Sequence, residues 1–205
     1  MRQLLWFGVL SLLAGCAGKP SRILPPAIDA EQAGLDAVSE YDKNANDQID
    51  GAELDAVPGV KAALKALDKN TDGQVSAQEI TDRINLWKER KTGIMSLSCH
   101  VTLDGRPLEN AEVTIVPEKF LGPEVKPAKG TTGSDGRAML AIDDAELKAQ
   151  RINGAQCGFY KVEIVAPAGR SLPARYNTST TLGAEVSPDA DWANTGGIEF
   201  DLKSK

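Results

Sequence analysis

The strongest constraint on this chain is an internal repeat near its N-terminus. Residues 41–54, YDKNANDQIDGAEL, align without a gap with residues 67–80, LDKNTDGQVSAQEI. Both copies begin with an apolar residue followed by Asp-Lys-Asn, and both end with Glu and an apolar residue. A repeat at a fixed spacing indicates two copies of one supersecondary unit that fold against each other.

Oxygen-bearing side chains recur at alternate positions in each copy, and a glutamate closes the pattern. Calcium prefers about six to eight oxygen ligands, which a twelve-residue loop supplies from its first, third, fifth, seventh, ninth and last positions. In the first loop these are Asp42, Asn44, Asn46, the Gln48 carbonyl, Asp50 and Glu53. In the second loop they are Asp68, Asn70, Asp72, the Gln74 carbonyl, Ser76 and Glu79. The sequence therefore predicts two Ca²⁺ sites.

The ligand pattern resembles the loop of the EF-hand, D-x-[DN]-x-[DN]-G-x5-E. The second loop matches it fully, with Gly73 at the sixth position, whereas the first loop has Asp47 there. The sixth position needs a backbone with positive φ, which Asp tolerates better than most residues. We therefore expect the first loop to be strained and its ion to bind more weakly than the second.

Apolar residues at helical spacing lie on both sides of each loop, as the EF-hand resemblance requires. Those that precede the loops are Leu35, Val38 and Tyr41, then Val60, Leu64 and Leu67. The eighth loop positions, Ile49 and Val75, are both apolar, and the resemblance implies that they meet in a short two-stranded contact. Residues 28–92 are therefore predicted to form an all-α EF-hand pair with one shared core.

Two other interpretations of the repeat remain. The loops could be polar turns between amphipathic helices, because Asp and Asn are common in turns. The repeat is also similar to the dockerin, an extracellular docking module with duplicated calcium loops. Dockerin loops usually end in Asp and lack the entering helices, so Glu53 and Glu79 favour the EF-hand.

The first residues are typical of an export signal. Arg2 precedes an apolar run at residues 4–13. This run is too short to span a bilayer, because a membrane-spanning helix needs roughly 20 apolar residues. The following LAGC resembles the lipobox of bacterial lipoproteins. This resemblance implies that residues 1–15 are a signal peptide and that Cys16 is lipidated and anchors the protein to a membrane of the cell envelope. Residues 16–27, with three prolines, are then expected to be a flexible tether.

Two cysteines remain after Cys16, and export would place them in an oxidising compartment. Cys99 and Cys157 could form a disulfide, or they could be two small buried thiols.

The net charge of −6 lies within the repeat-bearing segment, residues 28–92. Lysines and arginines are dispersed along the chain, without the basic cluster that a phosphate backbone attracts. We therefore expect no nucleic-acid partner.

The pattern changes from helical spacing to alternation and turns in residues 95–205. Turns are expected at Asp104-Gly105 and at residues 134–136, and six or seven short strands at such spacing favour an antiparallel sandwich. The order DGRPLENAEVTIVP, TTGSDGRAML, GFYKVEIV, LPARYNTSTTLGAEVSPD and GIEFDL resembles the carboxypeptidase regulatory-like, or transthyretin-like, domain over residues 96–203. The resemblance implies an Ig-like sandwich that is usually non-catalytic.

The predicted fold class is α + β in separate domains, an all-α EF-hand pair followed by this β-sandwich. No catalytic residue is predicted, because His100 is the single histidine and no Gly-x-Ser-x-Gly, His-Glu-x-x-His or phosphate loop occurs. The expected function is calcium binding by a lipid-anchored envelope protein in a structural or interaction role, with an envelope protein or a glycan as partner. The alternative is a carbohydrate- or peptide-binding accessory module of an envelope enzyme system.

Overall fold

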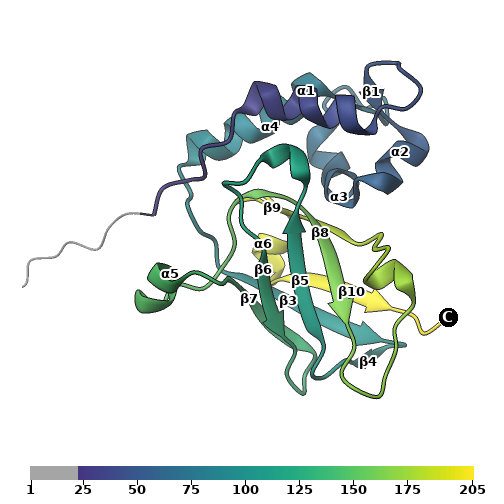
Figure 1. Ribbon diagram of the computed structural model, residues 1–205, viewed down its shortest axis with the longest axis vertical. Coiled ribbons are helices and arrows are strands. Elements are labelled where there is room, and N and C mark those ends of the chain that lie inside the picture. The colour runs from purple at the N-terminus through teal and green to yellow at the C-terminus, as the bar shows by residue number, and fades with distance from the viewer. Residues whose placement is uncertain (1–22) are drawn as a thin grey trace, which may run out of the picture.

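The first half of the folded chain is helical, in a computed structural model that describes residues 23–205 (Figure 1). Its elements are α1 (Ala30–Tyr41), β1 (Gln48–Ile49), α2 (Gly51–Ala56), α3 (Pro58–Leu67), β2 (Val75–Ser76) and α4 (Ala77–Arg90). Asp29 caps α1 by accepting a hydrogen bond from the Gln32 N–H, and Pro58 occupies the first position of α3, where its missing N–H is not needed.

The second half is built mainly of strands. They are β3 (Leu97–Leu103), β4 (Arg106–Pro107), β5 (Glu112–Pro117), β6 (Ala128–Thr131), β7 (Arg137–Ile142), β8 (Gly158–Val165), β9 (Gly183–Val186) and β10 (Ile198–Leu202). Short helical segments connect them: η1 (Lys119–Leu121), α5 (Ala145–Ala149), η2 (Ala174–Tyr176) and α6 (Trp192–Thr195). The two predicted turns are confirmed, because β3 and β4 pair around Asp104-Gly105 and β6 pairs with β7.

The strands form one curled sheet and not two packed sheets. Their order is β10-β3-β7-β6-β5-β8-β9, with β4 paired to β3. Every pair is antiparallel except β10 with β3, in which Ile198 lies opposite Cys99 in parallel register. The predicted antiparallel sandwich is therefore wrong: the sheet is a half-barrel, and it contains a parallel pair.

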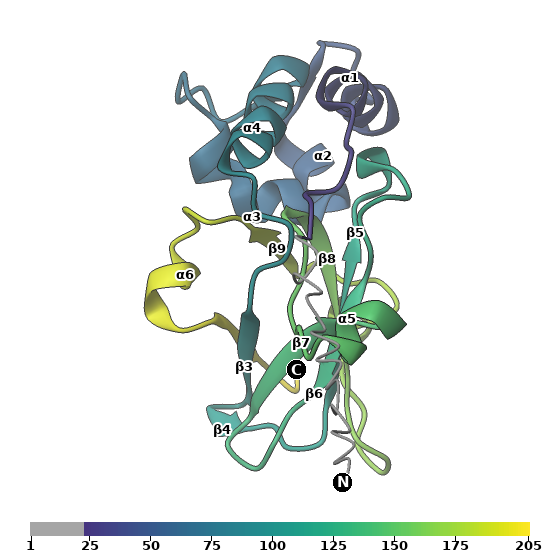
Figure 2. The ribbon, with the colours of Figure 1, turned by 90° about the vertical axis from the view of Figure 1, so that its left-hand side faces the viewer.

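Helices α1 to α4 form a layer across one end of this sheet, as both views show (Figures 1 and 2). Helix α3 lies directly on β8 and β9, where two glycines permit close approach of the backbones. A Cβ at Gly183 would lie 1.8 Å from the Pro58 carbonyl oxygen, and one at Gly59 would lie 2.6 Å from the Tyr160 nitrogen. No side chain larger than hydrogen fits at either position without displacing α3.

A single hydrophobic core runs from the helices into the sheet. Trp87 of α4 packs on Phe159 of β8 with ring centroids 4.7 Å apart, and Tyr41 of α1 meets Phe120 of η1 at 6.4 Å. The prediction of separate domains, the first of them all-α, is therefore wrong. The helices are short, and the buried surfaces of α3 and α4 are completed by the sheet; the helical layer also contains its own two-stranded ladder, β1 with β2.

Candidate functional site

The two predicted loops lie side by side at the outer end of the helical layer. Strands β1 and β2 pair antiparallel, with Ile49 opposite Val75 and Gln48 opposite Ser76. Both Ile49 and Val75 are fully buried. This register confirms the expected contact between the eighth positions, and it relates the two loops as equivalent halves of one unit.

Each loop is closed by its first aspartate in the same way. Asp42 Oδ2 accepts a hydrogen bond from the Asp47 N–H at 2.9 Å. In the second loop, Asp68 Oδ2 accepts from the Gly73 N–H, also at 2.9 Å. The first aspartate therefore organises the sixth residue in both copies, although one copy has glycine there and the other has aspartate.

The backbone at the sixth position is left-handed in both loops. Gly73 has a φ of 78° and Asp47 a φ of 63°, so the expected positive φ at Asp47 is confirmed. The fourth positions repeat the same feature, with φ of 58° at Ala45 and 61° at Thr71. An L-residue in this region costs roughly 1–2 kcal/mol, less for Asp than for most others.

The last glutamate of each loop turns back toward the loop backbone. Glu53 Oε1 accepts from the Lys43 N–H at 2.7 Å and Oε2 from the Asp50 N–H at 3.1 Å. These N–H donors lower the pKa of Glu53, the Lys43 donor most. Glu79 makes the equivalent bonds, from the Lys69 N–H at 3.1 Å and the Ser76 N–H at 2.9 Å. Each glutamate thus joins the two ends of its loop.

The remaining predicted ligands also bond within their loops. Asn46 Oδ1 accepts from the Gln48 N–H at 3.0 Å, as Asp72 Oδ1 does from the Gln74 N–H at 2.9 Å. Asn46 Nδ2 donates to Asp50 at 2.8 Å, and Asn70 Nδ2 to Asp72 at 2.7 Å. Asn44 contributes its backbone N–H to Glu53 at 3.2 Å.

The loop carboxylates carry negative charge that no lysine or arginine neutralises. Within residues 23–205, none of the six acidic ligands has an ion-pair partner; they are Asp42, Asp50, Glu53, Asp68, Asp72 and Glu79. In the same part of the chain, no three His, Cys, Asp or Glu side chains lie together as a group that could hold a metal ion. All twelve predicted ligands thus lie in two matched loops, but their carboxylate oxygens accept hydrogen bonds from backbone and asparagine side-chain N–H groups of the same loop and do not converge on one point.

The other predicted sites have different outcomes. Cys16 and the predicted signal peptide, residues 1–15, lie outside the described residues. Cys99 and Cys157 are buried free thiols, so no disulfide joins them in this structure. Burial raises the pKa of the Cys99 thiol to about 11 and that of Cys157 to about 12, which keeps both protonated. His100 pairs with Glu199 of the neighbouring parallel strand, at 2.6 Å between Nδ1 and Oε2.

Sequence reasoning missed a buried ionic cluster between α4 and the sheet. Arg83 lies on the apolar face of α4 and is 5% exposed. Its Nε donates to Glu185 Oε1 of β9 at 2.5 Å, and its two terminal nitrogens donate to Asp189 at 2.9 Å each. The one signal in the sequence is an arginine among Ile80, Ile84 and Trp87, at the spacing of a buried helix face.

Burial and the Arg83 guanidinium have opposite effects on the pKa values of the two carboxyl groups in this cluster. Burial raises the pKa of Glu185, and the Arg83 guanidinium opposes that rise. Arg83 and a hydrogen bond from Ser187 overcome the desolvation of Asp189 and lower its pKa to about 2. The cluster fixes α4, whose first turn carries Glu79, the last predicted ligand of the second loop, onto β9.

Comparison of the chain with protein-family models, curated proteins and solved structures finds no match. The resemblances to the EF-hand, to the lipobox and to the carboxypeptidase regulatory-like domain are therefore not tested by these comparisons and stay predictions. In the described part of the chain, no helix is long and apolar enough to cross a membrane.

Proposed function

We propose that this protein binds two calcium ions through its paired loops. The observation that carries the proposal is the equivalence of the loops: the first aspartate accepts from the sixth N–H at 2.9 Å in both, and the closing glutamate bonds the same two backbone positions in both. The bonds from the Asp50 and Ser76 N–H groups are those of a helix capping box, so the distinctive part of the pattern is the second bond of each glutamate, from the Lys43 or Lys69 N–H at the other end of its loop.

The donor set fits a hard divalent cation. All side-chain ligands offer oxygen, three of them in each loop are carboxylates, and no cationic side chain among residues 23–205 competes for those carboxylates. A bound cation would replace the backbone N–H groups that now face Glu53 and Glu79. The chain's own contribution is to hold these oxygens on two short loops that are joined through Ile49 and Val75.

The loops sit on a rigid support, which favours a structural or interaction role. Helix α4 begins at the second loop and is fixed to the sheet by Arg83 and Trp87. A cation in this loop would stabilise the folded state by the free energy of its binding, because the unfolded chain holds no such arrangement.

The amide N–H resonances of Gly73 and Asp47 test the calcium sites directly. Each donates to the first aspartate of its loop, so a cation on that aspartate polarises the hydrogen bond and moves both resonances downfield. We expect saturable shifts of both with calcium, Gly73 at the lower concentration. Absence of a saturable shift at Gly73 would contradict the proposal.

We further propose that the protein is held at the cell envelope by a lipid on Cys16, and that its calcium-loaded form contacts an envelope protein or glycan. The LAGC motif supports the anchor. Incorporation of labelled palmitate in bacterial cells should occur in the wild type and disappear in Cys16→Ser. Pull-downs from envelope extracts, with calcium and with chelator, test the partner. Equal capture under both conditions would show that binding of the partner does not depend on the calcium sites.

A further inference from the structure

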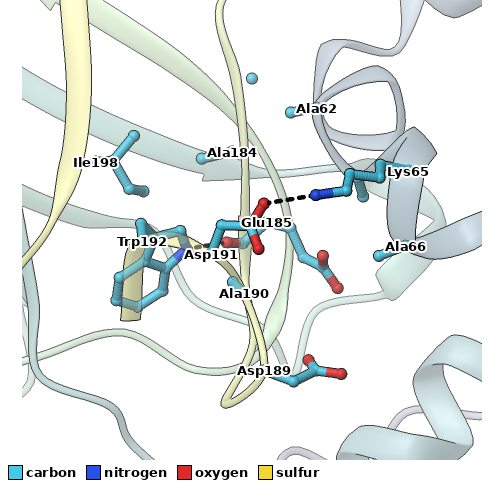
Figure 3. Close-up of a pocket in the computed structure, with 12 residues that line it drawn as sticks. Ala62, Lys65, Ala66, Ala184, Glu185, Asp189, Ala190, Asp191, Trp192 and Ile198 are labelled. Atoms are coloured by element: carbon cyan, nitrogen blue, oxygen red, sulfur yellow. Dashed lines mark hydrogen bonds and ion pairs between the residues drawn. The ribbon is translucent and has the colours of Figure 1, made fainter. Parts of the chain in front are cut away.

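A cavity of about 360 Å³ lies between α3 and the segment from β9 to β10, apart from the calcium loops (Figure 3). Its helix side consists of small side chains, Ala62, Ala63 and Ala66. Trp192 and Ile198 form the opposite wall, with Ala184 between the two sides. This volume falls at the lower end of the range for small-molecule sites, and the mixture of an apolar wall with a few polar groups is typical of them.

Two carboxylates lie at one end of the cavity, and both form ion pairs with the same guanidinium, that of Arg83. Glu185 and Asp189 line the cavity, and Arg83 behind them donates to each. Two negative charges against one positive charge leave this end with a net negative charge of one. Glu185 is only 8% exposed and Asp189 is 35% exposed at its side chain, so solvent screens this charge only in part.

A weak ion pair lies at the rim. Lys65 of α3 and Asp191 are 3.1 Å apart, and both side chains are 88% exposed. A pair so exposed to water contributes little and opens readily. A ligand can therefore displace Lys65 at small cost, and Asp191 then adds to the negative charge.

The indole ring of Trp192 is held in a fixed orientation. Its Nε1 donates to the Glu185 carbonyl at 2.8 Å, which ties the ring to the same residue that brings a carboxylate to the cavity. An indole face attracts alkyl groups and cations, and Trp is the most favourable aromatic residue for a cation.

We propose that this cavity binds a primary aliphatic ammonium group, with its alkyl stem between the α3 alanines and Trp192 and its charge toward Glu185 and Asp189. A carboxylate ligand would meet net negative charge, and a neutral alkyl ligand would leave that charge unneutralised. A free alkylamine and a lysine side chain of a polypeptide share this chemistry. The proposal is independent of calcium binding.

The test is a titration of the full chain followed by the indole N–H resonance of Trp192, assigned with Trp192→Phe. n-Butylammonium, which matches a lysine side chain, should shift this resonance saturably. 1-Butanol should bind at least about fivefold more weakly, because it lacks the charge that the carboxylates and the indole attract. A missing shift, or equal affinity for the two probes, would overturn the proposal.

Cavity-filling variants locate the site. Ala66→Leu should abolish the n-butylammonium shift, and Ala62→Leu, at a more exposed position, serves if the first variant loses its fold by circular dichroism. Ala149→Leu, on an exposed face of α5, should bind as the wild type does. Binding that survives both α3 variants would place the amine elsewhere and overturn the proposal.

Two peptides distinguish the sources of the ammonium group. A blocked Gly-Lys-Gly that binds at least as tightly as n-butylammonium, while the blocked norleucine peptide does not, supports a polypeptide ligand. Binding of the free amine without the lysine peptide supports a small amine. Equal binding of the lysine and norleucine peptides contradicts recognition of the charge.

Discussion

A buried carboxylate between the helical layer and the sheet should make the stability of this protein depend on pH. Glu118 follows β5 and is fully buried. Its Oε1 accepts from the Gly59 N–H, at the start of α3, at 3.0 Å, while Oε2 is buried without a hydrogen-bond partner. Burial, opposed in part by the Gly59 donor, raises the pKa of Glu118 to about 7.

The magnitude follows from the difference between the folded and unfolded states. A rise in pKa from 4.5 to about 7 corresponds to about 3 kcal/mol, since a tenfold change in proton affinity is worth about 1.4 kcal/mol. The folded state holds the proton more tightly than the unfolded chain. This contribution is therefore fully present below pH 4.5 and is lost as the pH rises through about 7.

Glu118→Gln removes the titrating group but keeps an oxygen for the Gly59 N–H. Relative to the wild type, its free energy of unfolding should increase by about 2–3 kcal/mol between pH 5 and pH 8, because only the wild type loses the contribution of the protonated carboxyl. Urea unfolding in calcium-free buffer, followed by tryptophan fluorescence, measures this. Glu112→Gln, at an exposed position on β5, is the matched control and should show no such trend. A Glu118→Gln difference that is the same at both pH values would refute the reasoning.

Three further changes test other parts of the structure. Arg83→Ala should lower the free energy of unfolding by about 3–5 kcal/mol in urea, because it leaves Glu185 buried without its partner; an effect no larger than that of Arg90→Ala, at the exposed end of α4, would contradict this. Asp47→Gly should tighten calcium binding at the first loop, by up to about 1 kcal/mol, since glycine adopts the φ of 63° without strain; unchanged affinity in a calcium titration would contradict a strained loop. Gly183→Ala should lower the midpoint of thermal unfolding strongly, because its Cβ would meet the Pro58 carbonyl oxygen; a wild-type midpoint would contradict the close packing of α3.

The local features of this fold could be predicted because their causes lie within short stretches of sequence. The loop pattern fixed the pairing of Ile49 with Val75 and the left-handed backbone at Asp47. Asp104-Gly105 likewise produced the turn between β3 and β4, where both residues have positive φ.

The arrangement of the strands could not be predicted in the same way. Alternation indicates which side chains of a strand face the core, but it does not say which strand lies alongside. A sandwich and a curled sheet both bury one face of each strand. The parallel pairing of β10 with β3 joins segments about a hundred residues apart, and no local pattern specifies it.

The contact between the helices and the sheet could not be predicted from the sequence for a related reason. Gly59 and Gly183 each look like an ordinary turn glycine, and only their approach in space reveals that α3 needs both. Arg83 was the one available sign, because a charged residue on an apolar helix face requires a buried partner. Its partners lie roughly a hundred residues further along the chain.

Calorimetric titration with calcium, comparing the wild type with Glu79→Gln, tests the central claim most directly. Glu79 closes the second loop, and Glu89→Gln, at an exposed position on the same helix, is the control. We predict two binding events in the wild type and in the control, and loss or marked weakening of the tighter event in Glu79→Gln. Equal heats from the wild type and Glu79→Gln, or no heat of binding from the wild type, would contradict the assignment of the loops as calcium sites.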